Sequence, residues 1–225
     1  MKKQVFAILG ILAITAVMIY LAAQYGEHTR FDYKKDLDKT VFTLDGKDYR
    51  LSDMTYYIAR QEMTIEEQAM VYNPDNTNEY WGLHTNGEFV RLTAKKAVLD
   101  RAVHDMMFLE AAQKEGIKLD EDEQKYVDDS ASDFCYDLED EQKERAGLTD
   151  EQIYEMTEKA ALAEKYQILL AEEKGENFGA YDYNGKAYEK MLEEHKLKIK
   201  KKFWNKVPFG NVTLDHEFKD EEDES

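Results

Sequence analysis

Residues 92–116, LTAKKAVLDRAVHDMMFLEAAQKEG, form the longest stretch beyond the N-terminal segment with a regular helical period. Apolar side chains recur three or four residues apart and therefore share one face of a helix. They are Leu99, Ala102, Val103, Met106, Leu109 and Ala112, widened by Val98, Phe108 and Ala111. The pattern predicts a helix from Thr93 to Glu115, ended by Gly116 in the left-handed conformation. Its apolar arc is too wide for one partner, which places it at the centre of a helical domain.

Further helices are predicted on both sides of this one, and the two prolines of the chain favour long uninterrupted helices. Asp120 with Glu123, and Thr149 with Gln152, have the spacing of capping boxes at helix starts. The predicted helices run from Ser52 to about Tyr72, from Asp120 to a break at Gly147, from Thr149 to about Lys174 and from Lys186 to about His195. A loop from Asn76 to Phe89, whose Tyr80 and Trp81 cover the core, is expected before the central helix.

A small sheet is predicted from two separate segments of the chain. Asp45-Gly46 between Val41–Leu44 and Tyr49–Leu51 indicates a β-hairpin, and a lone hairpin is only marginally stable in water. Residues 196–200, KLKIK, alternate strictly between charged and apolar side chains, as a strand does. We therefore predict that Leu197–Ile199 is the third strand, and that residues after Lys186 complete the domain that begins at Val41. The expected fold class is mainly α with a three-stranded element and an N-terminal transmembrane helix.

Four regions are expected along the chain. Residues 1–26 contain 19 successive uncharged residues, Val5–Ala23, after Lys2 and Lys3. About 20 apolar residues span a bilayer, so this run predicts a single-pass anchor with its N-terminus in the cytoplasm and the bulk outside, or else a cleaved signal and a secreted protein. Residues 27–40 are predicted to be a tether, residues 41–214 the helical domain, and residues 215–225 a disordered acidic tail.

Charge and cysteine content limit the classes of partner. The formal net charge of −18 repels phosphate backbones, so nucleic-acid binding is not expected. The single cysteine, Cys135, excludes an internal disulfide and a multi-cysteine metal site. The sequence leaves the oligomeric state open.

No constellation of catalytic or metal-binding residues stands out in the sequence. The five histidines, His28, His84, His104, His195 and His216, do not pair with acids at metal-ligand spacings. Gly-rich phosphate loops and nucleophile elbows are absent from the sequence as well. His104 is interpreted as a solvated or hydrogen-bonded helix residue, and we expect no enzyme activity, no metal and no cofactor.

Binding through apolar side chains is the remaining possibility. Methionine and aromatic residues adapt to varied apolar partners, although most of them belong to cores. The residues predicted to contact a polypeptide are Met54, Tyr57, Tyr80, Trp81, Met106, Met107 and Phe134.

The order of these motifs resembles the N-terminal chaperone domain of the SurA-like and PrsA-like foldases, which are exported parvulin-type peptidyl-prolyl isomerases. An export segment is followed by VFTLDGKDYRLSDMTYYI, then EAAQKEGIKLDEDEQ, AGLTDEQIYEM and KYQILLAEEK. The segment YEKMLEEHKLKIKKKFW is similar to the returning helix and strand of that module. The resemblance covers about Val41 to Leu214 and implies the holding or folding of exported chains.

The chain departs from that family in having only 11 residues between Lys174 and Lys186, where the parvulin domain would be inserted. A domain needs about 50 residues or more, so the family's catalytic residues have no counterpart here. We expect a membrane-tethered extracytoplasmic chaperone that binds unfolded or newly exported polypeptides without isomerase activity. The alternatives are an adaptor or regulatory subunit that docks one membrane or secreted protein, and a weak peptidyl-prolyl isomerase.

Overall fold

The central helix contributes more buried residues than any other helix or strand in the described part of the chain. A computed structural model describes residue 31, residues 33–85 and residues 87–210. The central helix, α5 (Val90–Glu115), begins three residues before the predicted start. Gly116 ends it with a φ of 71°, and the Ile117 amide donates to the Ala112 carbonyl at 2.9 Å. Residues 102–109 are all buried, so neighbours cover this part of the helix on every side.

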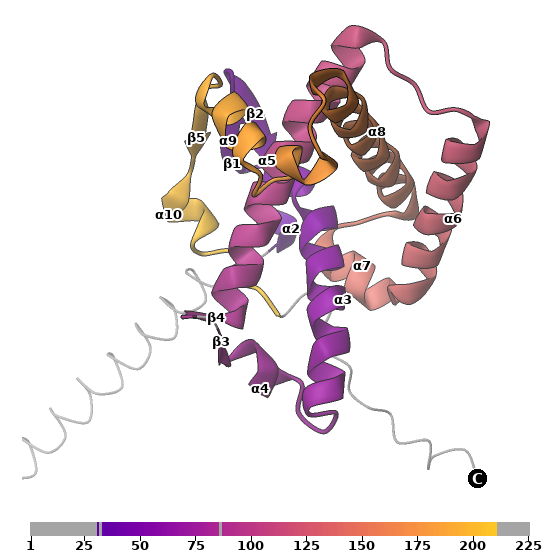
Figure 1. Cartoon of the computed structure of the whole chain (residues 1–225). Helices are drawn as coiled ribbons and strands as arrows, with labels where there is room; N and C mark the ends of the chain where they lie inside the picture. The colour runs from indigo at the N-terminus through magenta and orange to yellow at the C-terminus, as the bar shows by residue number, and fades with distance from the viewer. Residues whose placement is uncertain (1–30, 32, 86, 211–225) are drawn as a thin grey trace, which may run out of the picture. The chain divides into compact units, whose positions relative to one another are not determined.

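Helices α3 (Thr55–Tyr72) and α8 (Asp150–Lys174) pack against α5, and α6 (Glu121–Asp137) packs on α8 (Figure 1). The predicted capping box of α8 is confirmed, because the Thr149 amide donates to Gln152 Oε1 at 2.9 Å and the Gln152 amide donates to Thr149 Oγ1 at 3.2 Å. Local sequence signals therefore determine where this long helix begins.

The predicted start of α6 is also confirmed, but its end is not. Asp120 Oδ1 accepts from the Glu123 amide at 2.9 Å, and the Asp120 amide donates to Glu123 Oε2 at 2.7 Å. The helix ends at Asp137 because Leu138 is extended, and a separate short helix, α7 (Asp140–Ala146), precedes Gly147.

The start of α3 differs from the prediction. Ser52 does not cap the helix, because residues Leu51–Asp53 form a turn of 3-10 helix, η1, with Met54 at the N-cap position of α3. Asp53 Oδ2 instead accepts from the Arg50 amide at 2.7 Å. This bond closes the start of η1, and no side chain caps α3 itself; the helix still ends at Tyr72 as predicted.

The three-stranded antiparallel sheet is confirmed, with the order β2-β1-β5. Its strands are β1 (Thr40–Leu44), β2 (Lys47–Arg50) and β5 (Leu197–Ile199). Asp45 and Gly46 both have positive φ, 50° and 91°, as the tight hairpin turn requires. Phe42 pairs with Ile199, which brings together residues more than 150 positions apart.

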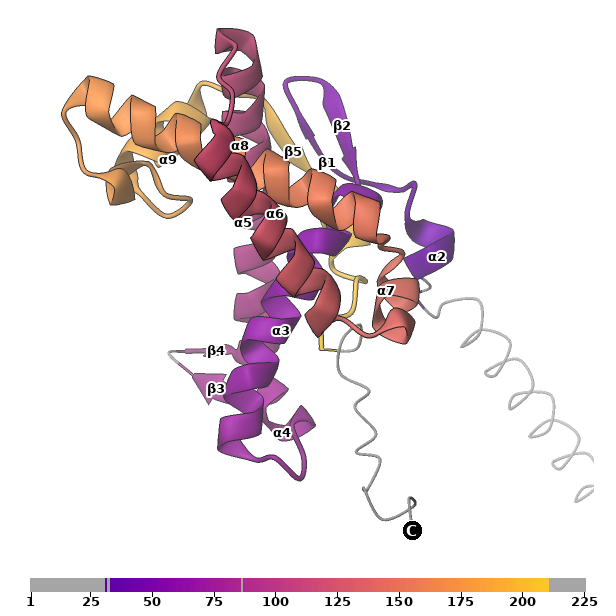
Figure 2. The same cartoon turned by 90° about the vertical axis from the view of Figure 1, so that its right-hand side faces the viewer.

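The described residues from Tyr33 to Gly210 belong to one compact unit. After α8 the chain runs through η2 (Phe178–Tyr181), α9 (Lys186–Glu193), β5 and α10 (Lys201–Trp204). The sheet and α4 lie toward opposite ends of α5 in both views (Figures 1 and 2).

Two expected irregular segments contain structure. Part of the predicted tether is folded: α2 (Tyr33–Asp36) contacts α7, and the Tyr33 hydroxyl donates to the Pro208 carbonyl at 2.8 Å. The predicted loop 76–89 contains α4 (Asn78–Trp81) and the strand pair β3 (His84–Thr85) and β4 (Glu88–Phe89). Trp81 is fully buried there, as expected.

The predicted membrane anchor and the acidic tail lie outside the described residues. Within the described ranges, no helix has the length and apolar character that crossing a bilayer requires.

Candidate functional site

Six of the seven side chains predicted to contact polypeptide lie inside the domain. They are Met54, Tyr57, Trp81, Met106, Met107 and Phe134, and each exposes less than a tenth of its surface. Met106 and Met107 belong to the part of α5 that neighbours enclose, and Phe134 packs edge-on against Tyr56 with ring centroids 5.6 Å apart. A polypeptide could reach these six only if the core opened, so the accessible apolar surface lies elsewhere.

Several exposed apolar side chains lie where α3 ends and α5 begins, beside α4 and the β3–β4 pair. Val71 exposes 88% of its surface, and Tyr72, Phe89 and Leu92 expose between 49% and 54%. Tyr80, the seventh predicted residue, is half-buried on α4 in the same region. We call these five residues the apolar end; the elements that carry them lie together at the bottom of Figure 1.

Local contacts hold the apolar end in place. The rings of Tyr72 and Tyr80 lie 5.7 Å apart, and the Tyr80 hydroxyl donates to Gln68 Oε1 at 2.8 Å. On the neighbouring strand pair, the rings of His84 and Phe89 meet edge to face at 5.1 Å. The exposed apolar side chains therefore stand on a platform in which α3, α4 and the start of α5 contact one another.

Trp81 attaches this platform to the core of the domain. Its side chain is fully buried, and a Cβ on Gly210 would come within 2.8 Å of its indole ring. Gly210 has a φ of 79°, and its amide donates to the buried Glu62 carboxylate at 2.8 Å. Only glycine fits this close approach, so the chain at Gly210 packs directly against Trp81, the buried residue next to Tyr80 of the apolar end.

Sequence reasoning missed four residues of the apolar end: Val71, Tyr72, Phe89 and Leu92. Only Val71 lies off the apolar face predicted for the first helix. Tyr72 follows Ala69 by three residues on that face, and Leu92 precedes Leu99 by seven residues on the arc of the central helix. Position off the buried face could have identified Val71. Tyr72, Phe89 and Leu92 lie at or just before helix ends, where the apolar face extends beyond the core, and the sequence pattern alone does not indicate that.

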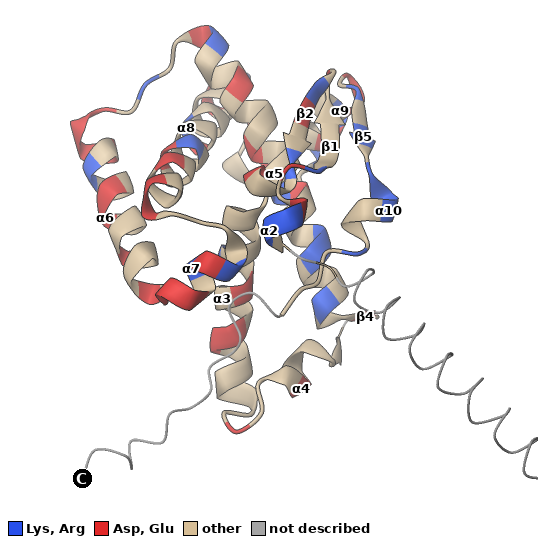
Figure 3. Cartoon of the chain, turned by 180° about the vertical axis from the view of Figure 1, so that it is seen from behind, with Lys and Arg blue, Asp and Glu red and all other residues tan. Residues whose placement is uncertain are grey.

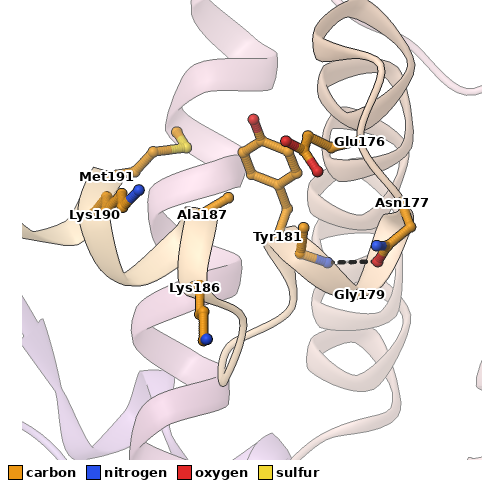
Figure 4. A pocket seen from close by; sticks show the side chains of 9 residues that line it. Glu176, Asn177, Gly179, Tyr181, Lys186, Ala187, Lys190 and Met191 are labelled. Atoms are coloured by element: carbon orange, nitrogen blue, oxygen red, sulfur yellow. Dashed lines mark hydrogen bonds between the residues drawn. The ribbon is translucent and has the colours of Figure 1, made fainter.

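A second feature is a hollow of about 650 Å³ between the end of α8, η2 and α9 (Figure 4). Figure 4 shows Tyr181 standing between the two walls, with Glu176 beside it and Met191 facing it from α9. Asn177 shapes one wall, because its Oδ1 accepts from the Ala180 amide at 3.0 Å. The hollow falls within the size range of ligand pockets, roughly 300–1,000 Å³, and offers both charged and apolar contacts.

A smaller, polar cavity of about 330 Å³ lies between α3, α5 and α8. Arg60 and Arg101 line it together with Asp105, Glu164 and Tyr57, so both signs of charge face one space. Burial, and next the nearby Asp105 carboxylate, raise the pKa of Tyr57 well above its usual value. The cavity can hold a small polar ligand, but no pair of its groups forms a nucleophile with a base.

His104 is hydrogen-bonded, as expected, but it is buried rather than solvated. Its Nδ1 lies 2.7 Å from Asp105 Oδ1 and its Nε2 lies 3.0 Å from the Tyr181 carbonyl oxygen. Among the described residues, no group of three or more His, Cys, Asp or Glu side chains is arranged to hold a metal ion. His104 therefore joins α5 to η2, at the edge of the hollow that Tyr181 lines.

Comparisons with known proteins do not place the chain in a family. No family model, no curated protein and no solved structure matches it. The case for a function accordingly rests on the surface and the packing described above.

Proposed function

We propose that this protein is a chaperone that uses its apolar end to bind extended apolar segments of unfolded or newly exported polypeptides. The observation that carries the proposal is the apolar end, in which Val71, Tyr72, Phe89 and Leu92 are exposed and Tyr80 is half-buried on the platform that supports them. Exposed apolar side chains gathered at one end of a domain favour association with other apolar surfaces. Aromatic and aliphatic residues together accept varied sequences, because burial of apolar area needs no fixed hydrogen-bond pattern.

The connection between α8 and α9 also supports a role in binding rather than in isomerisation. Residues 175–185 pass directly from α8 through η2 to α9. The foldases that the sequence resembles carry their parvulin domain at this position. In the proposed function the chain therefore holds its client without accelerating prolyl isomerisation, and the N-terminal apolar run keeps it at the outer side of a membrane.

The proposal is tested by the aggregation of several unrelated, chemically unfolded client proteins in the presence of the full chain. The wild type should suppress aggregation of all of them. The double substitution Val71→Ser and Tyr72→Ser should reduce this protection several-fold, because it removes two of the most exposed side chains of the apolar end.

The matched control is Tyr126→Ser with Tyr136→Ser on α6, whose rings are 74% and 90% exposed but lie on a different element. The control should protect clients as the wild type does. If both double variants lose protection equally, the apolar end is not the binding surface. If the wild type protects no client but retains one cellular protein in stoichiometric amount, the protein is an adaptor and the chaperone proposal fails.

A further inference from the structure

Positive charge is concentrated in two segments of this acidic protein. Residues 89–99 and 196–210 contain nine of the 30 Lys and Arg residues and none of the 48 Asp and Glu residues. They are Arg91, Lys95, Lys96, Lys196, Lys198, Lys200, Lys201, Lys202 and Lys206. All are exposed except Lys95, which is half-buried. In the described part of the chain none of the nine forms an ion pair with an acidic side chain.

The fold joins these two segments into one surface. Arg91 Nε donates to the Phe209 carbonyl at 2.9 Å, and Lys95 Nζ donates to the Val207 carbonyl at 2.6 Å. The start of α5 and the segment after β5 are thus bonded side by side. Figure 3 shows the blue residues of α10 and of the start of α5 on one side, with the red residues of α6 and α7 on the other. We call the nine residues and their surface the basic face.

The chain also connects the basic face to its N-terminal apolar run. Tyr33, whose hydroxyl donates to the Pro208 carbonyl at 2.8 Å, follows Ala23 by ten residues. Ten extended residues span at most about 33–36 Å. With the proposed anchor 5–23 in a bilayer, the part of the basic face near Pro208 can therefore lie no more than about 36 Å from the end of that anchor, which is near enough to reach the headgroups.

We propose that the basic face docks on the anionic headgroups of the bilayer that holds the N-terminal run. Lysines near an anionic membrane are attracted to it over about one Debye length, roughly 10 Å at 0.1 M salt. The strongly negative remainder of the domain is repelled from the same surface. Attraction on one side and repulsion on the other orient the domain, so that α6 and α7 face away from the membrane.

The acidic segment 215–225 is the competing occupant, since it begins five residues after Gly210. The acidic segment has only 11 residues. The lysines and arginine of the basic face, in contrast, are spread over β5, α10 and the start of α5. A planar bilayer can approach all of these lysines at once, which favours lipid as the partner.

The test measures how fast each lysine of the full chain reacts with an amine-acetylating reagent in lipid nanodiscs. Lys201, Lys202 and Lys206 should react several-fold more slowly in nanodiscs that contain phosphatidylglycerol than in pure phosphatidylcholine. Exposed Lys114, Lys118 and Lys125 on α5, the following loop and α6 are the matched controls and should react equally in both. Addition of about 0.5 M NaCl should restore the rates, because salt screens such attraction.

Two triple variants distinguish an effect of the basic face on this protection from an effect of net charge alone. Lys201→Gln, Lys202→Gln and Lys206→Gln together should remove the lipid-dependent protection of Lys198 and Lys200. Replacement of Lys114, Lys118 and Lys125 by Gln changes the net charge equally and should leave that protection in place.

Three outcomes overturn the proposal. Equal rates in the two lipids, or a full chain that does not associate with phosphatidylglycerol nanodiscs, exclude docking on anionic lipid. Protection in phosphatidylcholine that disappears when residues 215–225 are removed identifies the acidic segment as the occupant. Equal slowing of Lys114, Lys118 and Lys125 shows that the protection is not specific to the basic face.

Discussion

At the scale of single residues, His104 is the most constrained polar group of the core. Only 1% of its surface is exposed, and both of its ring nitrogens face hydrogen-bond acceptors. The ring is therefore held between the Asp105 carboxylate and the Tyr181 backbone carbonyl. The resulting buried pair with Asp105 joins α5 to η2, and so links the core to the hollow beside α9.

Replacement of His104 by leucine should therefore be strongly destabilising. It removes the ring nitrogens that lie against Asp105 Oδ1 and the buried Tyr181 carbonyl, and each buried polar group that loses its partner costs about 1–3 kcal/mol of unfolding free energy. Urea denaturation followed by circular dichroism measures the change. His84→Leu is the control, because His84 is exposed, and it should alter stability by no more than about 0.5 kcal/mol. A His104→Leu protein that unfolds within about 1 kcal/mol of the wild type would show that the pair is not a structural link.

At the scale of elements, the hairpin is attached to the central helix through one carboxylate. Glu110 Oε1 accepts from the Tyr49 hydroxyl at 2.6 Å and from Lys47 Nζ at 2.8 Å. Burial alone would raise the pKa of Glu110, but the hydrogen bonds from Lys47 and Tyr49 outweigh it and lower that pKa below its usual value. The ionised carboxylate therefore contributes to the stability of the folded state.

The contribution of Glu110 should disappear in acid. Because its folded pKa is below the unfolded value of about 4.3, its stabilisation is complete above that pH and is lost as the pH falls through the folded pKa. Glu110→Gln should cost about 0.5–1.5 kcal/mol at neutral pH, and the difference from the wild type should shrink in acid. Denaturation midpoints between pH 7 and pH 2 measure this, with exposed Glu158→Gln on α8 as control. A difference that is the same at every pH would contradict the assigned role.

The elements themselves were predictable where short-range chemistry determines them. Asp45-Gly46, Asp120 with Glu123, and Gly116 each act on neighbours within a few residues, and the structure confirms all three. The pairing of β5 with β1 was also predictable, because the alternating segment 196–200 matches the hairpin's need for a third strand. Other features that depend on distant packing were not predictable. The burial of Met107 requires neighbours on the side of α5 away from the predicted apolar face, and Trp81 under Tyr80 packs on Gly210, more than 100 residues away.

At the scale of the whole molecule, the last described segments of the chain pack against the first ones. Strand β5 pairs with β1, and the segment after it bonds to α5 and α2. Leu192 and Ile199 are only half-buried, since α9 and β5 lie at the surface of the domain. The buried side chains of this region are instead Tyr188, Trp204, Val207 and Phe209.

Removal of the residues after Lys186 should abolish cooperative folding. Burial of Tyr188, Trp204 and Phe209 contributes about 1.5–3 kcal/mol each, against a total stability of about 5–15 kcal/mol for a domain. The shortened chain also loses the third strand, which leaves the hairpin as a two-stranded ribbon that is marginal in water. Thermal unfolding monitored by circular dichroism should show a broad transition at a much lower temperature than that of the full chain. A protein that ends before Asp215 keeps every described element and should melt with the full chain; if the one that ends at Lys186 does so too, the two ends of the chain do not form one domain.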